Sequence, residues 1–127
     1  MITLQSNPER MKNFKDNKKD WPRLTLWPAV DTTTLEKFIE VDEETVGIIC
    51  PKYLEKIKHD GNWGKLGCDL SYYTLFRHIQ KQDLGGWFLI VEDDVQILPK
   101  IMELEKYLPK WANRYHYVRL YQKTQDW

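Results

Sequence analysis

The apolar run from Phe88 to Val91 ends abruptly in three consecutive acids, Glu92, Asp93 and Asp94. A short continuous apolar run is typical of a strand buried in a parallel sheet, and α/β sheets bind ligands outside the carboxyl ends of their strands. Crowded carboxylates repel one another unless a cation lies between them. Mg2+ and Mn2+ prefer oxygen ligands, and they are commonly bound by one or two carboxylates together with substrate phosphates. The run therefore predicts a metal-assisted diphosphate site. An acidic turn after a strand is the alternative interpretation.

Length and composition limit the class of protein. With 127 residues, the chain is expected to form a single domain over residues 1–127, short for an enzyme that processes sugars or nucleotides. Basic and acidic residues balance at 19 each, so no overall charge favours nucleic acid or an anionic membrane as a partner. We expect no transmembrane segment and no secretory leader, and hence a cytoplasmic protein. Cys50 and Cys68 form no CxxC pair and are expected to be buried free thiols.

Predicted strands and helices alternate from the N-terminus. Residues 2–4 read as a first strand, Asn7 and Pro8 begin a helix as its N-cap and first residue, and residues 24–27 read as a second strand. This order is typical of βαβ units and favours a mostly parallel sheet.

The middle of the chain gives further start signals. Thr33 and Glu36 have capping-box spacing, residues 46–50 favour a strand or a buried turn, and Pro51 is expected to begin a helix. Next, Gly61, Gly64 and Gly67 predict a loop.

The most regular helical spacing follows that loop, from Cys68 to Ile79. After the apolar run, the spacing of Ile101, Leu104 and Leu108 predicts a helix that Pro109 should stop. Residues 115–121 read as a final strand.

Four segments carry a more specific pattern. They are ITL with NPER at residues 2–10, WPAVD at 27–31, GKLGCDLSY at 64–72 and LIVEDDV at 89–95. In order and spacing they resemble glycosyltransferase family 25, which includes galactosyltransferases of lipooligosaccharide or lipopolysaccharide biosynthesis and of collagen. The third segment is the most specific, similar to G-x-(I/L)-G-C-x-x-S-H with Tyr72 in place of the histidine.

The resemblance implies a GT-A-like, Rossmann-like α/β fold, a mostly parallel sheet flanked by helices, truncated relative to full family members. It also implies that the acids act as a DxD motif. Asp94, with Glu92, would then hold Mn2+ (or Mg2+) between the phosphates of a UDP-sugar, and Glu92 or Asp93 would reach the ribose or a metal-bound water. Arg10 and Asp31 would lie near the nucleotide, Asp31 as an acceptor from uracil or ribose. A solvated Arg10 and a turn role for Asp31 are the alternatives.

Gly64 and Gly67 would let the backbone approach a ligand, and Lys65 would either meet a phosphate or be solvated. Tyr72 keeps an aromatic ring but not the titratable nitrogen of the family's histidine.

Family members continue beyond the length of this chain and use that part for the acceptor. Three hypotheses stay open. The first is a hexosyltransferase that moves a sugar, expected to be galactose, from the UDP-sugar to a saccharide acceptor. Another is a non-catalytic nucleotide-sugar-binding or interaction protein that works as a homo-oligomer or with a completing partner chain. A third is a remnant of the fold with neither activity.

Overall fold

The computed structural model describes residues 1–33, 47, 49–83, 85–114, 116, 118 and 120. Glu36 of the predicted capping box, residues 46 and 48 of the segment predicted over 46–50, and most of the strand predicted over 115–121 lie outside these residues. The chain divides into two compact units, Met1–Gln96 and Ile97–Trp127. A single domain over residues 1–127 stays a prediction.

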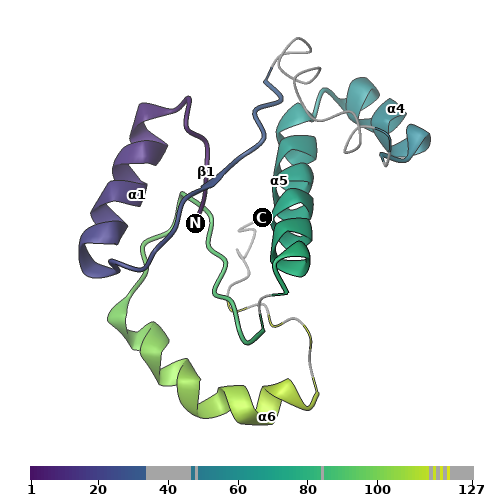
Figure 1. Cartoon of the computed structure of the whole chain (residues 1–127). Helices are drawn as coiled ribbons and strands as arrows, with labels where there is room; N and C mark the ends of the chain where they lie inside the picture. The colour runs from purple at the N-terminus through teal and green to yellow at the C-terminus, as the bar shows by residue number, and fades with distance from the viewer. Residues whose placement is uncertain are drawn as a thin grey trace, which may run out of the picture. The chain divides into compact units, whose positions relative to one another are not determined.

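The first unit begins with a βαβ arrangement, shown in Figure 1. Strand β1 (Ile2–Thr3) leads into helix α1 (Pro8–Asp20), and β2 (Trp27–Pro28) returns parallel to β1. The Asn7 side chain accepts hydrogen bonds from the first-turn N–H groups of α1, and Pro8 needs no such partner because it has no N–H. The predicted start of this helix is confirmed.

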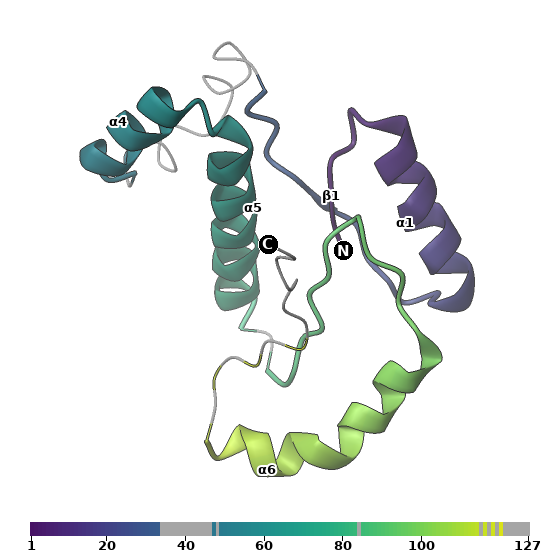
Figure 2. The ribbon, with the colours of Figure 1, turned by 180° about the vertical axis from the view of Figure 1, so that it is seen from behind.

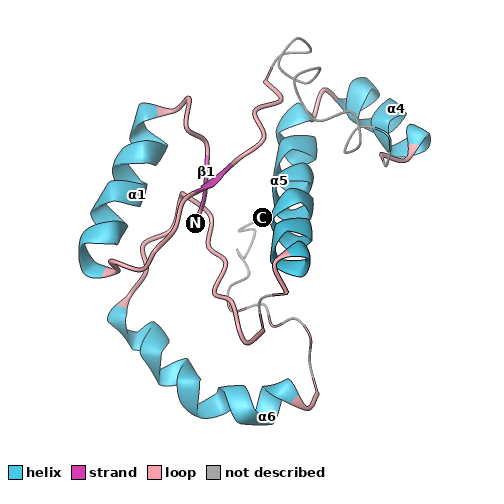
Figure 3. Cartoon of the chain, in the orientation of Figure 1, coloured by secondary structure: helices cyan, strands magenta, loops and turns pink. Residues whose placement is uncertain are grey.

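A third segment lies along the other edge of β1. The amide of Ile2 donates to the carbonyl of Val91 at 2.9 Å, and Ile2 forms an isolated parallel bridge with Glu92. Figure 3 draws the preceding apolar run as loop, and Phe88 and Leu89 are 43% and 47% exposed. The prediction of a buried strand over residues 88–91 is therefore wrong for the described residues. An apolar run is buried only where both of its faces are covered, and β1 is too short to pair with more than its end.

The described strands amount to a two-stranded parallel sheet and one further bridge. This sheet is too small to show a Rossmann-like GT-A domain, which stays a prediction. Among the described helices, none has the length and apolar character needed to cross a bilayer.

Helices α4 (Pro51–Asp60) and α5 (Trp63–Lys81) pack through a core of Ile57, Leu66 and Leu70. The predicted helix start at Pro51 is confirmed, and α4 ends at a glycine in the left-handed conformation. In the views of Figures 1 and 2, α1 and α5 lie on opposite sides of β1.

Helix α5 begins earlier than its apolar spacing predicted. Gly64 and Gly67 lie inside it, so the prediction that they form a ligand-facing loop is wrong. A Cβ added at Gly67 would come within 2.7 Å of the Val30 carbonyl oxygen and 2.9 Å of Thr32 Oγ1. One turn later, Ser71 Oγ accepts from the Val30 amide at 2.8 Å and donates to the Gly67 carbonyl at 2.6 Å. Gly67 and Ser71 thus fix α5 against the chain that follows β2.

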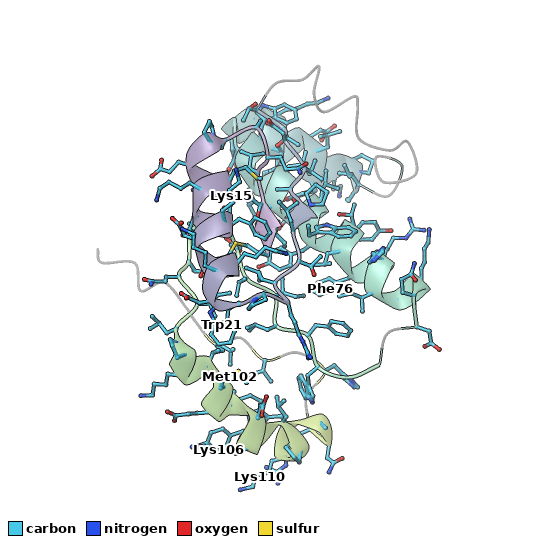
Figure 4. The ribbon with its side chains drawn as sticks, turned by 60° about the vertical axis from the view of Figure 1, so that its left-hand side comes forward. Lys15, Trp21, Phe76, Met102, Lys106 and Lys110 are labelled. Atoms are coloured by element: carbon cyan, nitrogen blue, oxygen red, sulfur yellow. The ribbon has the colours of Figure 1, made fainter. Side chains whose placement is uncertain are left out.

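The second unit contains a 3-10 helix, η1 (Pro99–Tyr107), followed by α6 (Leu108–Ala112). Figure 4 labels Met102, Lys106 and Lys110 along this stretch. The prediction that Pro109 stops a helix is wrong, because Pro109 lies in the first turn of α6. Proline is tolerated there, since first-turn N–H groups have no partner within the helix.

Replacing Gly67 with alanine tests the close packing of α5. We expect Gly67→Ala to lower the free energy of unfolding by about 1–3 kcal/mol, because the added methyl group overlaps a backbone oxygen. Gly64→Ala is the matched control, since its Cβ meets open space and alanine favours a helix by up to about 1 kcal/mol. Urea unfolding of both variants measures the difference. Equal effects would contradict the packing.

Candidate functional site

The chain after β1 meets the chain after the apolar run. The amide of Leu4, directly beyond β1, donates to Asp93 Oδ2 at 2.8 Å, and Arg10 Nη1 of α1 donates to Asp93 Oδ1 at 3.1 Å. Arg10 Nη1 also lies 3.7 Å from Asp94 Oδ2. The structure thus brings Arg10, Asp93 and Asp94 together at the carboxyl end of β1, and a ligand site there stays a prediction.

The side chains of these three residues differ in exposure. Asp93 is 14% exposed, Arg10 39% and Asp94 58%. Asp93 is therefore enclosed between β1 and α1, whereas the Asp94 carboxylate is open to solvent. Arg10 spans the two and partly neutralises both.

Two asparagines hold the backbone that follows Asp93. Asn13 Nδ2 donates to the Asp93 carbonyl at 2.6 Å and to the Val95 carbonyl at 3.2 Å. Asn17 Nδ2, one turn later on α1, donates to the same Val95 carbonyl at 3.1 Å. Sequence reasoning missed both. Their i, i+4 spacing places both on the inward face of α1 beside Phe14. A buried amide there needs a hydrogen-bond partner, and this spacing was the signal that could have identified them.

Asp31 lies beyond β2 at the same end of the sheet. Its Oδ2 accepts from Ser6 Oγ at 2.8 Å, and its Oδ1 accepts from the amide and the hydroxyl of Thr33 at 3.1 and 2.8 Å. The carboxylate therefore joins the chain after β1 to the chain after β2. This geometry matches the turn role for Asp31.

Glu92 points toward α5 instead of toward Arg10. Its Oε1 accepts from the Tyr72 hydroxyl at 3.0 Å. Tyr72, which stands where the family pattern has histidine, therefore acts as a hydrogen-bond donor to the first acid of the triplet. The sequence did not predict this contact.

Cys68 lies one helical turn before Tyr72. Partial burial of its sulfur, and then the negative charge of Glu92, raise the pKa of the Cys68 thiol above its ordinary value. Both cysteines are free, and both are exposed as residues, so the prediction of buried thiols is wrong. Cys50 is the N-cap residue of α4 and Cys68 lies in α5, and both are outside the small core around Leu66.

Two further groups are committed to local bonds. Lys65 Nζ lies 3.1 Å from Asp69 Oδ2 one turn along α5, an exposed pair. The first-turn amides of α1 at Glu9 and Arg10 donate to the Asn7 side chain. Among the described residues, the cation that pairs with Asp93 and Asp94 is the Arg10 guanidinium.

The side-chain oxygens near the acidic triplet determine which kind of cation site is possible there. Within the part of the chain that the structure describes, no three His, Cys, Asp or Glu side chains form a group that could hold a metal ion. Asp94 offers an open carboxylate, and Glu92 has oxygens near the same turn. One or two carboxylates suit Mg2+ or Mn2+ only where substrate phosphates complete the coordination. The residues fit a cation that arrives with a diphosphate, not an all-protein metal site.

Comparison of the chain with protein-family models, with curated proteins and with solved structures finds no match.

The thiol of Cys68 provides a probe of Glu92. In a Cys50→Ser background, we expect Glu92→Gln to lower the pKa of Cys68 and to speed its alkylation by iodoacetamide at neutral pH, because the thiolate is the nucleophile. Glu55→Gln on α4 removes one charge elsewhere in the unit and should leave the rate unchanged. An unchanged rate in Glu92→Gln would place the Glu92 carboxylate away from Cys68.

Proposed function

We propose that the chain binds a UDP-sugar together with a divalent cation, Mn2+ or Mg2+, as the donor half of a hexosyltransferase that glycosylates a saccharide acceptor. The observation that carries the proposal is the placement of Arg10 and the open Asp94 carboxylate beyond the carboxyl end of β1. The four sequence segments similar to glycosyltransferase family 25 support the choice of a UDP-hexose, expected to be UDP-galactose.

The proposal assigns separate roles to the charged residues. The Arg10 guanidinium pairs with a phosphate oxygen, for which its planar fork of N–H donors is suited. Asp94, with Glu92, holds the cation. When bound, that cation neutralises charge that builds on the UDP leaving group. Asp31 accepts from ribose or uracil only if it gives up one of its bonds to Ser6 or Thr33.

Transfer also needs an acceptor held in attack geometry. The proposed acceptor and the proposed transfer step rest on the family resemblance alone.

A second candidate is a non-catalytic nucleotide-sugar-binding or interaction protein. The exposed apolar side chains of Trp87, Phe88 and Leu89, which precede the residues bonded to β1, favour it. A stable oligomer in light scattering would support this candidate, and a strict monomer would count against self-association.

Isothermal titration of UDP and UDP-galactose, with and without Mn2+, tests the donor site. We expect Mn2+ to strengthen nucleotide binding in the wild-type protein and Asp94→Ala to abolish that gain, because an exposed carboxylate is the proposed ligand. Glu55→Ala is the control for loss of one acid elsewhere. Absence of binding under every condition would contradict the proposed function and leave the interaction protein as the better candidate.

A further inference from the structure

The carboxylate of Asp93 makes a different set of contacts from those of its neighbours. Each of its oxygens accepts a hydrogen bond from the protein, one from the Leu4 amide and one from Arg10 Nη1. The Asp93 carbonyl also accepts from Asn13 Nδ2 at 2.6 Å. Asp93 thus joins β1, α1 and the acidic turn, and only 14% of its side chain is exposed.

We infer that Asp93 is a positioning residue that holds the Arg10 guanidinium beside Asp94, and that it contacts neither the cation nor the nucleotide. This assignment departs from the expectation that Asp93 reaches the ribose or a metal-bound water. The statement that Asp93 contacts no ligand rests on the proposed function. The hydrogen bond by which Asp93 holds Arg10, the tether, does not depend on that function.

The energetic reason is preorganisation. An arginine side chain has many rotamers, and fixing it on a ligand costs conformational entropy. A charge-assisted hydrogen bond to a partly enclosed carboxylate restricts the guanidinium before the ligand arrives. The separation of 3.7 Å between Arg10 Nη1 and Asp94 Oδ2 is too long for a hydrogen bond. Asp94 therefore attracts the guanidinium electrostatically but does not fix its orientation.

The first experiment observes Arg10 directly, by 15N NMR of its guanidinium without any ligand. We expect hindered rotation of the guanidinium in the wild-type protein, loss of that hindrance in Asp93→Asn, and its retention in the matched variant Asp94→Asn. The amide oxygen of the new asparagine can still accept from Leu4, which preserves the end of β1. Retained hindrance in Asp93→Asn, or its loss in Asp94→Asn, would overturn the tether.

The second experiment is a double-mutant cycle on UDP affinity, measured by titration. Asp93→Asn should weaken UDP binding about tenfold, the size expected from losing one hydrogen bond to a charged group. In an Arg10→Gln background, the same substitution should have no further effect on affinity. A loss of equal size in that background would show that Asp93 contacts the ligand itself, and would overturn the positioning role.

The two experiments separate the two proposals. If the wild-type protein binds no UDP with or without Mn2+, the proposed function fails, and the NMR measurement alone decides whether Asp93 holds Arg10. If UDP binds and the guanidinium of Asp93→Asn rotates as in the wild type, the positioning inference fails while the donor site stands.

Discussion

Hydrogen bonding along both edges of β1 is the constraint on which the first unit depends. On one edge the carbonyl of Met1 accepts from Trp27 at 2.8 Å, and on the other the amide of Ile2 donates to Val91 at 2.9 Å. Because both neighbours run parallel to β1, the chain leaves all three segments at the same end. Residues far apart in the sequence therefore meet there. In open α/β sheets, such an end between neighbours on opposite sides is where ligands bind.

The acidic turn divides its three carboxylates among different partners. Glu92 turns toward Tyr72 on α5, Asp93 turns toward Arg10 on α1, and Asp94 faces solvent. This division relieves much of the repulsion that three adjacent acids would otherwise suffer, since two of them accept hydrogen bonds from the protein. A cation is therefore not needed to explain why the acids are tolerated. The case for a cation site rests on the open Asp94 carboxylate and on the family resemblance.

Local signals in the sequence predicted the starts of α1 and α4. Asn7 with Pro8, and Pro51, act through backbone groups within one turn, so no distant contact can override them. The family resemblance implied that Arg10 and the acids belong to one nucleotide site, and the structure brings Arg10 close to Asp93 and Asp94.

The predictions that were wrong depend on tertiary contacts, which local sequence signals do not report. Gly64 and Gly67 read as loop residues until Val30 is seen to pack against Gly67, and the exposure of Phe88 depends on how little of the apolar run pairs with β1. Asn13 lies on the inward face of α1, but its partner Asp93 is 80 positions away in the chain. Such pairings cannot be read from spacing alone.

The glycine and serine of α5 connect the packing of the helix to the chemistry of the site. Gly67 lets α5 approach the Val30 carbonyl, and Ser71 bonds to the Val30 amide, so two consecutive turns of α5 are held against the chain beyond β2. Tyr72 is the next residue on this helix, and its hydroxyl reaches Glu92. Glu92 is in turn bridged to Ile2 of β1. The contact between Tyr72 and Glu92 thus depends on the close packing of α5 that Gly67 permits.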